Sequence, residues 1–364
     1  DYAPPAGLLP NQCARQGPRP FTRVGSVDAA LVNGVFGDPL LHVRLRHQGR
    51  SLLFDLGDGG RLSARVAHQV SDVFVSHAHM DHLGGFFWLM RSRIGELPVC
   101  RLVGPPGLAR QVDGLIRGFL WDRVGEAGPV FEVAELHGDL LQHSRLQAGR
   151  AGIETLPSTS VEDGIVLREP GFRVRAITLD HHTPVLAYAW EPSSQYHVRT
   201  DRLRDLGLQP GPWINELKRY LTLGELDADV QLPDDSEQPA GALADALILT
   251  SPGRRLVYAT DLADTAENRA RLQGLARNAH TLFLEAAFIE ADEAQARKHG
   301  HLTGRACGEI ADAAGVARLV PFHLSRRYLD RPQVVYDEIK AVCPRVAVPP
   351  ADRRDAGAIS GLER

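Results

Sequence analysis

The segment Asp72-Val73-Phe74-Val75-Ser76-His77-Ala78-His79-Met80-Asp81-His82-Leu83-Gly84-Gly85 decides the fold class of this 364-residue chain. It begins with a short apolar run of the kind that forms a buried strand. Directly after this run, three histidines and one aspartate occupy six consecutive positions. Neutral imidazoles and a carboxylate are suitable ligands for zinc, manganese or iron. The two glycines then allow the backbone to turn tightly. The segment therefore predicts a metal site at the end of a strand.

The spacing of these ligands indicates an extended segment or loop. His77 and His79 are two residues apart, whereas two histidines on one face of a helix are a turn apart. The Asp81-His82 pair that follows must point toward a neighbouring position, so one short loop can serve two metals. The chain has 15 histidines, and a lone strand histidine is more often structural than a ligand. Four potential ligands within six residues favour the metal site.

Three later apolar runs each end in a further potential ligand. Residues 174–178 are followed by Asp180-His181-His182, residues 256–259 by Asp261, and residues 319–322 by His323. Each alone could be a capping aspartate, a structural histidine or a turn. Together they predict one site, because ligands collect at the carboxyl ends of strands in α/β proteins. Neighbouring side chains on a strand point in opposite directions, so His181 and His182 are not both expected to bind.

The order of apolar and helical segments predicts an α/β protein. Strands are expected at residues 40–45, 51–54, 72–75, 174–178, 255–259, 282–284 and 318–322, and helices at 86–93, 107–120, 266–277 and 304–315. This order predicts a sheet covered by helices. We expect one domain over residues 20–345, with terminal extensions at 1–19 and 346–364.

Residues 191–245 differ in character from the rest of the chain. They contain Pro210-Gly211-Pro212 and an acidic, proline-bearing run near residues 227–237. This composition predicts an insertion with a short helix at 214–221 and a mobile loop. The four tryptophans are expected in the core or at interfaces, and Trp213, beside the Pro-Gly-Pro turn, is the candidate among them for substrate contact.

Composition excludes some classes of protein. The chain is 43% hydrophobic and 24% charged, as in soluble globular proteins with a sizeable core. It contains no run of about 18 apolar residues that could form a membrane-spanning helix. The net charge of −4 gives no support for general nucleic-acid affinity, so any polyanion site must be local. The cysteines 13, 100, 307 and 343 are scattered, which favours a reduced, cytoplasmic protein.

An ordered series of motifs runs through residues 51–328. It consists of Phe54-Asp55-Leu56-Gly57, the cluster at 77–82, Gly104-Pro105-Pro106-Gly107, Asp180-His181 with Pro184 and Tyr188, Tyr258-Ala259-Thr260-Asp261, Leu284-Glu285-Ala286-Ala287-Phe288, Gly300-His301-Leu302-Thr303 and His323-Leu324-Ser325-Arg326-Arg327-Tyr328. The series resembles the metallo-β-lactamase-fold hydrolases. Its last three motifs resemble the ribonuclease Z (tRNA 3′-endonuclease) branch. The resemblance implies a four-layer αββα sandwich.

The resemblance also implies a dinuclear metal centre. His77, His79 and His181 would hold one metal, Asp81, His82 and His323 the second, and Asp261 would bridge them. His181 is chosen over His182 because its offset to Pro184 matches the family segment. The implied enzyme is a phosphodiesterase in which two divalent ions, Zn²⁺ or alternatively Mn²⁺, act through a bridging hydroxide.

Roles for other side chains follow from the same resemblance. Asp81 would also accept the proton of the attacking water, and His301, oriented by Glu285, would protonate the leaving alkoxide. Ser325 and Arg327 would bind a phosphate oxygen, although Arg327 could equally form a surface ion pair. Asp55 is expected to orient a metal histidine through its ring N–H.

Several functions remain open from the sequence. The phosphodiester could be RNA, such as precursor tRNA, or a small substrate such as a cyclic nucleotide. A β-lactamase or other acyl hydrolase of the same fold is a second class, but it needs neither the His-Glu pair nor the terminal Ser-x-Arg-Tyr motif. A non-catalytic binding protein is a third class, and the complete ligand set argues against it. Relatives in the family commonly form homodimers, so the resemblance also implies a homodimer. Two features depart from the family pattern: Met80 stands where a small residue is usual, and the basic residues of 191–245 are balanced by acidic ones.

Overall fold

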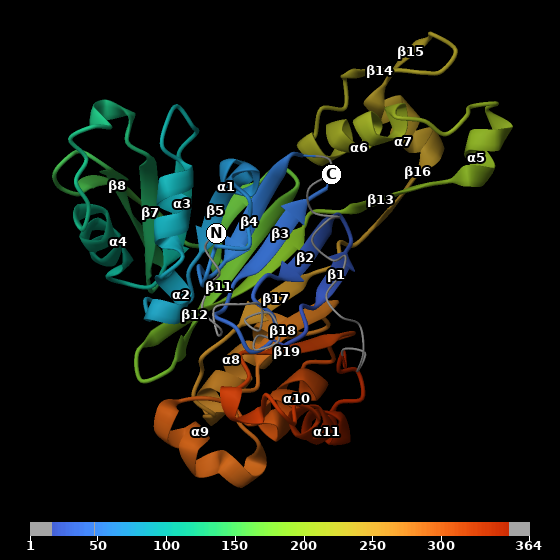
Figure 1. Ribbon diagram of the computed structural model, residues 1–364. Coiled ribbons are helices and arrows are strands. Elements are labelled where there is room, and N and C mark those ends of the chain that lie inside the picture. Colours follow the sequence, from blue (N-terminus) through green and yellow to red (C-terminus); the bar gives the residue numbers. More distant parts are fainter. Residues whose placement is uncertain (1–16, 47, 349–364) are drawn as a thin grey trace, which may run out of the picture.

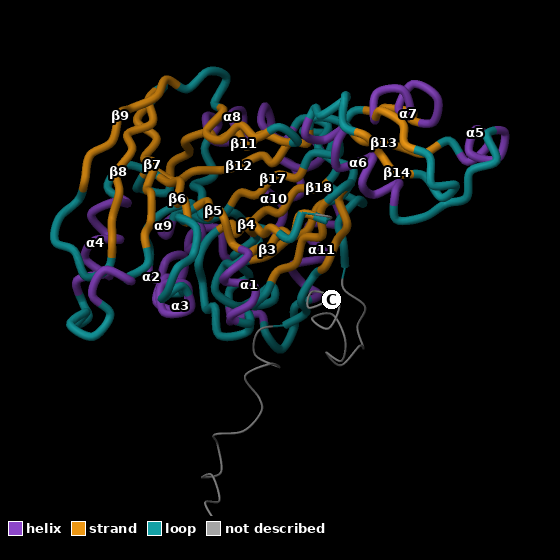
Figure 2. The backbone as a smooth tube through the Cα atoms, turned by 90° about the horizontal axis from the view of Figure 1, so that it is seen from above, coloured by secondary structure: helices purple, strands orange, loops and turns teal. Residues whose placement is uncertain are grey.

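The computed structural model describes residues 17–46 and 48–348, which form two large sheets packed face to face with helices on both outer sides (Figures 1 and 2). This is the predicted four-layer αββα arrangement, and the fold prediction is therefore confirmed. The predicted terminal extensions lie almost entirely outside the described residues. No helix in the described ranges is long and apolar enough to cross a membrane.

Both large sheets combine parallel and antiparallel pairs. The first contains, in spatial order, β1 (Phe21–Val24), β2 (Val27–Leu31), β3 (Leu41–Leu45), β4 (Arg50–Phe54), β5 (Val70–Phe74), β6 (Cys100–Gly104), β7 (Val130–His137), β8 (Leu140–Gln147) and β9 (Glu154–Ser160). The second contains β10 (Ile165–Glu169), β11 (Phe172–Asp180), β12 (Pro184–Pro192), β17 (Leu256–Ala259), β18 (Thr281–Glu285) and β19 (Leu319–Phe322). Strands β4 to β7 are parallel, as are β17 to β19.

The central strands are largely apolar toward their carboxyl ends because both of their faces are buried there. In β4, Leu52 and Phe54 enter the core between the two sheets, whereas Leu53 packs on the opposite face. Residues after β4 and in β5 follow the same alternation, since successive strand side chains point to opposite faces. A strand that is covered on both sides needs apolar residues at every position. This is why short uninterrupted apolar runs located these strands in the sequence.

The helices form the two outer layers. One group packs beside the first sheet and contains α1 (Ala64–Gln69), α2 (Met80–Leu83), α3 (Phe86–Ser92) and α4 (Leu108–Arg117). The other packs beside the second sheet and contains α8 (Ala266–Ala276), α9 (Glu293–His299), α10 (Gly304–Ala313) and α11 (Gln333–Val342). In α4, Leu108, Val112 and Ile116 are buried at intervals of four residues, which places one apolar face on the sheet.

Residues 195–251, here called the arm, project from one end of the sandwich (Figure 1). The arm contains β13 (Gln195–Val198), α5 (Thr200–Asp205), α6 (Trp213–Leu223), β14 (Asp229–Gln231), β15 (Glu237–Pro239), α7 (Ala240–Leu247) and β16 (Ile248–Ser251). Its apolar cluster is separate from the cores of the two sheets. The predicted helix at 214–221 is part of α6, but the prediction of a loop in the acidic run was wrong, because Val230 and Leu232 are buried and anchor this run as a hairpin. Glu191 is part of β12.

Trp213 is part of this arm core. Its side chain is buried, and its indole N–H donates a hydrogen bond of 2.9 Å to the carbonyl oxygen of Gln209. The structure therefore places Trp213 in the packing of the arm, in agreement with the general expectation for the tryptophans. Substrate contact by its ring would require the arm to open.

A charged network joins the two sheets away from the strand ends that carry the ligands. The fully buried Asp72 accepts from Arg50 at 2.7 Å and from Arg101 at 2.6 Å. Both arginines also bind Glu169, on the second sheet, at 3.1 and 2.7 Å. Burial raises the pKa of Glu169, but the hydrogen bonds from the two arginines outweigh it and hold this pKa below its usual value. The ionised Glu169 therefore stabilises the contact between the sheets.

Replacing Glu169 by glutamine is expected to lower the thermal midpoint by a few degrees at pH 7. The loss of charge-assisted hydrogen bonds corresponds to about 1–2 kcal/mol. A carboxylate with a lowered folded-state pKa stabilises the protein above its unfolded pKa and ceases to do so as the pH falls through the folded value. The midpoints of the wild type and E169Q should therefore converge below about pH 4. Thermal scans from pH 3 to 8 test this, with the exposed Glu162→Gln as control. An equal difference at all pH values would contradict it.

Candidate metal centre

The predicted ligands lie together at one edge of the sandwich, where strands of both sheets end. Asp55 follows β4, His77 follows β5, His181 follows β11, Asp261 follows β17 and His323 follows β19. Three of these residues have left-handed backbone conformations, with φ of 59° at Asp55, 50° at Asp261 and 55° at His323. Such conformations are uncommon in residues other than glycine and collect at functional sites. The chain turns sharply at these strand ends.

Three groups of side chains could each hold a metal ion. Within each group, the candidate ligand atoms all lie within 4.8 Å of one another. The groups are His77, His79, His181 and Asp261; then Asp81, His82 and His323; and then Asp261, Glu285, His301 and His323. The first two, with Asp261 between them, contain all seven predicted ligands. The third group was not anticipated as a ligand set.

Asp261 lies at the centre of the arrangement. Its Oδ2 is 3.7 Å from Nε2 of His77, 3.7 Å from Nε2 of His181 and 3.3 Å from Nε2 of His82. Its Oδ1 is 3.3 Å from Nδ1 of His323. The carboxylate is buried and faces both histidine groups, which is the position that a bridging ligand requires.

Fixed hydrogen bonds orient the rings of the first group. His181 Nδ1 lies 2.8 Å from the carbonyl oxygen of Gly300, and a carbonyl can only accept, so this nitrogen carries the proton. The Nε2 lone pair is then directed toward Asp261. Gly300 has φ of +70°, and a Cβ there would lie 3.0 Å from the His181 ring, so a glycine is needed at this close approach. His182 is exposed and lies outside all three groups.

Asp55 orients His82 directly and His77 through Ser76. Its Oδ2 lies 2.9 Å from Nδ1 of His82, which is the contact expected with one of the candidate ligand histidines. The same oxygen accepts from the hydroxyls of Tyr258, at 2.7 Å, and Ser76, at 2.8 Å. Because the Ser76 hydroxyl donates to Asp55, it can accept from His77 Nδ1 at 3.0 Å. His77 and His82 thus present Nε2 to the centre, as histidine ligands with this kind of support do.

The donor set fits divalent metal ions. His82 Nε2 and His323 Nδ1 are buried and make no hydrogen bond within the described part of the chain, although carboxylate oxygens lie 3.3 Å from each. Buried ring nitrogens without a partner are costly, so these atoms require a ligand. Zn²⁺ and Mn²⁺ are both suited to sites in which four or more imidazole nitrogens and carboxylate oxygens act as ligands.

The electrostatics of the cluster agree with this fit. Burial, with His82 nearby, lowers the pKa of His77 to about 2, so that ring is neutral. Burial opposes ionisation of Asp261 and Asp81, but the surrounding histidines outweigh it and hold the pKa of both carboxyls well below the usual range. Although burial lowers the pKa of His82, Asp261 and Asp55 raise it well above its usual value. The carboxylates therefore favour positive charge at this centre.

His301 lies beside the cluster and is held by Glu285. His301 Nδ1 is 2.9 Å from Oε2 of the fully buried Glu285, whose Oε1 accepts from the backbone N–H of Leu262 at 2.7 Å. The ring centroid of His301 is 4.9 Å from that of His181 and 5.5 Å from that of His323. Burial lowers the pKa of His301, but the Glu285 carboxylate outweighs it and raises this pKa to about 9. Nε2 of His301 remains free of Glu285.

Ser325 and Arg327 lie next to the centre but not in it. The Arg327 guanidinium is 3.3 Å from Asp292 and 4.9 Å from the ring centroid of Phe288. The Phe288 ring is in turn 6.0 Å from that of His301. Ser325 precedes the short turn at Arg326–Tyr328 and donates its backbone N–H to Ala287. Arg327 is therefore ion-paired on a half-exposed surface, one ring away from His301.

Several residues that support the site were not identified in the sequence. They include Ser76, Tyr258 and the carbonyl of Gly300, which have no signature outside the fold. Asp38 also lies near, where burial and the Asp81 carboxylate raise its pKa. Asn33 donates to the backbone carbonyls of Asp38 and Asp58 at 3.0 and 2.9 Å and shapes the loop beside His323. Met80 is 87% exposed at the start of α2, so a large side chain is accommodated there without displacing the ligands.

Comparison with known families gives two matches along the chain. Residues 43–196 match the Metallo-beta-lactamase superfamily, and residues 230–324 match the Beta-lactamase superfamily domain. The stretch between them lies in the arm. The matched residues include all the predicted ligands.

Individual relatives cover most of the chain. A protein named Ribonuclease Z from Deinococcus radiodurans is 31% identical over 76% of this chain and 83% of its own length. Another Ribonuclease Z, from Brevibacillus brevis, is 30% identical over 79% of this chain and 80% of its own length. Among solved structures, the metallo-beta-lactamase fold protein YhfI from Bacillus subtilis aligns with a TM-score of 0.50 at 14% identity, over 85% of this chain and 87% of that one. The last match shows a shared fold alone.

Proposed function

Because this chain belongs to the ribonuclease Z family of the metallo-β-lactamase superfamily, we propose that it is a metal-dependent endoribonuclease that cuts precursor tRNA near its 3′ end. One observation supports phosphodiester chemistry in particular. A buried Glu285 holds His301 beside the Asp261-centred cluster, so an acid for a leaving alkoxide lies next to the metal ligands. Acyl hydrolysis does not require this pair.

We propose two divalent metals at this centre. His77, His79 and His181 would hold one, and Asp81, His82 and His323 would hold the other, with Asp261 between them. When bound, the pair activates water for attack and neutralises charge on the phosphodiester. Zn²⁺ is the proposed ion, and Mn²⁺ fits the same ligands.

The surrounding side chains then have distinct roles. Asp81, which is 41% exposed and bonded to His323, can accept a proton from the attacking water. His301 can give a proton from Nε2 to the leaving oxygen, since Glu285 fixes Nδ1. Ser325 and Arg327 remain proposed contacts for a phosphate oxygen. To bind phosphate, the Arg327 guanidinium must either contact the phosphate and Asp292 at the same time or break its ion pair with Asp292.

The purified protein is expected to cleave precursor tRNA only while metal is bound. Removal of metal by EDTA should lower the cleavage rate by more than about 100-fold, and Zn²⁺ or Mn²⁺ should restore it. Gel analysis of a 3′-extended tRNA gives the rate, and the same tRNA without its 3′ extension is the control. Bis(p-nitrophenyl) phosphate and a chromogenic β-lactam are assayed in parallel.

Each contrary outcome has its own meaning. Hydrolysis of the phosphodiester reporter without cleavage of tRNA would replace this proposal by a phosphodiesterase for small substrates. Hydrolysis of the β-lactam alone would indicate an acyl hydrolase. A homodimer also remains a prediction of the family resemblance, and light scattering of the metal-loaded protein tests it. The cytoplasmic location stays an expectation from cysteine usage.

A further inference from the structure

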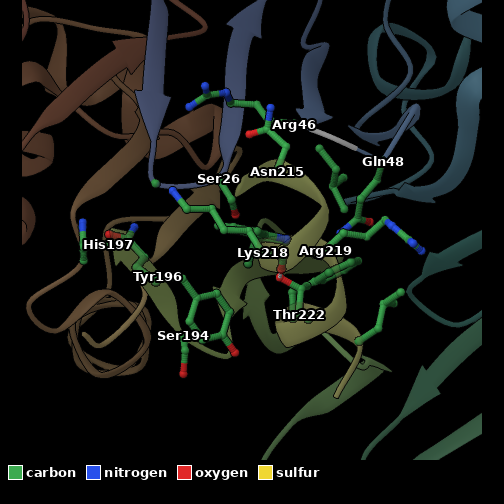
Figure 3. A pocket seen from close by; sticks show the side chains of 17 residues that line it. Ser26, Arg46, Gln48, Ser194, Tyr196, His197, Asn215, Lys218, Arg219 and Thr222 are labelled. Carbon is green, nitrogen blue, oxygen red and sulfur yellow. Dashed lines mark hydrogen bonds between the residues drawn. The ribbon is translucent and has the colours of Figure 1, made fainter. Parts of the chain in front are cut away.

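A cavity lies where the arm meets the sandwich. Its volume is about 540 Å³, within the range of small-molecule sites. Figure 3 shows Ser26, Arg46 and Gln48, from turns of the first sheet, facing Lys218 and Thr222 of α6 across the cavity. We call it the root cavity. The body and the arm both contribute to its walls.

The root cavity is far from the proposed metal centre. Phe172, which lines it, is the first residue of β11, and Asp180 is the last. The two ends of this strand are eight positions apart, which corresponds to about 25 Å. His181 follows Asp180 directly. The cavity is therefore not an extension of the metal centre.

The charges in the root cavity are all positive. Arg46, Lys218 and Arg219 line it together with His197, and its lining contains no aspartate or glutamate. Among the described residues, no ion pair joins Arg46 or Lys218 to a carboxylate. Burial, and then the nearby Arg46, lower the pKa of Lys218, which places the two cations close together. This contrasts with Arg50 and Arg101, whose charges are met by Asp72 and Glu169.

Two residues that line the cavity also carry buried hydrogen-bond donors without a partner among the described residues. The Trp190 side chain is 1% exposed, and its Nε1 is buried without an acceptor in the part of the chain that the structure describes. An indole nitrogen can only donate, and a buried donor without a partner is costly. Gln195 Nε2 is a second buried donor without a partner there. Because these two donors are buried behind the cavity surface, the cations that line the cavity are what favour a ligand rich in acceptor oxygens.

The remaining wall of the cavity is apolar. It is formed by Leu45, Phe172, Leu223 and the ring of Trp190. A free phosphate ion would satisfy the cations but would leave this wall and most of the volume unfilled. A ligand with a phosphoryl group on an organic body matches both parts.

We propose that the root cavity binds an organic phosphate of about the size of a nucleotide. Lys218 and Arg46 contact the phosphoryl oxygens, and the organic body packs on the wall near Phe172 and Trp190. Because α6 belongs to the arm and Arg46 to the body, the bound ligand joins the two and restrains the arm. This binding does not depend on the proposed catalytic function.

ADP is a suitable probe, measured by isothermal titration calorimetry on the metal-loaded protein. We expect saturable binding of one ADP per chain, with adenosine and pyrophosphate each binding at least about tenfold more weakly. Lys218→Gln should weaken ADP binding about tenfold or more, since a charge-assisted hydrogen bond is lost. Arg46→Gln removes the cation that faces Lys218 across the cavity, so it should also weaken binding about tenfold. Arg204→Gln, an exposed change on the same arm, is the matched control.

A metal-centre variant separates this site from the catalytic one. Asp261→Asn should leave ADP binding at the root cavity unchanged, whereas Lys218→Gln should leave metal content unchanged. Thermal midpoints establish that each variant is folded. Absence of saturable ADP binding would overturn the proposal, as would loss of binding in D261N or unchanged binding in both K218Q and R46Q. Equal affinity for pyrophosphate or adenosine would overturn the assignment to an organic phosphate.

Discussion

Replacing Asp261 by asparagine is expected to remove at least one of two bound metal equivalents and to lower tRNA cleavage by more than about 100-fold. Loss of a hydrogen-bond partner of a metal ligand already costs about 10–100-fold, and a direct ligand should cost more. Asp261 faces His77, His181 and His82 through one oxygen and His323 through the other. The asparagine amide has the same shape as the aspartate carboxylate but offers no negative charge to the two groups of candidate metal ligands.

Metal content and thermal stability test this effect independently of activity. Inductively coupled plasma mass spectrometry counts zinc per chain in the wild type and D261N. The wild-type thermal midpoint should fall on addition of EDTA, because ligands that bind only the native state stabilise it, and that of D261N should respond less. Asp264→Asn is the control variant, because it makes the same chemical change three residues away, at a carboxylate that forms an ion pair with Arg269. Two metal equivalents retained in D261N would refute the bridging role.

The strands and most candidate ligands of this protein could be predicted because burial on both faces leaves a direct mark in the sequence. Strand β19 and the last residues of β5 are apolar, and the first polar residue after each is a candidate ligand or lies next to one. His181 and the exposed His182 lie in the turn between β11 and β12, where the left-handed backbone of His182, with φ of 59°, separates the two side chains. The strand prediction follows from local geometry, which the sequence alone supplies.

The supporting shell of the site could not be predicted in this way. Tyr258 and Asp55 are 203 positions apart, and His181 and Gly300 are 119 apart, so only the folded chain brings them together. The left-handed turns at Asp55, Asp261 and His323 also lack the glycine that usually signals such a conformation. These turns persist because the packing around the site determines them.

The arm shows a different limit of sequence patterns. Strands β14 and β15 have only three residues each, too few for an alternating pattern to emerge, and the surrounding acidic residues suggested a loop. Two buried residues, Val230 and Leu232, decide the outcome by anchoring the hairpin. The root cavity was missed for the same reason as the supporting shell, since it is lined by Gly25, Arg46, Gln48 and Gly171 together with residues of α6 that are distant from them in the sequence.

Replacing His301 by alanine is expected to lower cleavage of precursor tRNA by about 10²–10⁴-fold, the usual contribution of a general acid or base. The loss should depend on the leaving group. A ribose alkoxide needs a proton as the bond breaks, whereas p-nitrophenolate leaves without one. Hydrolysis of bis(p-nitrophenyl) phosphate by H301A should therefore fall by much less than cleavage of RNA. Single-turnover rates on both substrates measure the two losses.

Two further measurements separate an acid from a metal ligand at this position. His301 also belongs to a candidate ligand group with Asp261, Glu285 and His323, so the zinc content of H301A must be counted. Unchanged zinc with a selective loss on RNA supports the acid role, while loss of zinc would make His301 a ligand. Glu285→Gln should reproduce the selectivity more weakly, because it keeps a hydrogen-bonding group near Nδ1 but removes the charge that holds the ring. Equal losses on both substrates in H301A would refute the role of His301 as the acid.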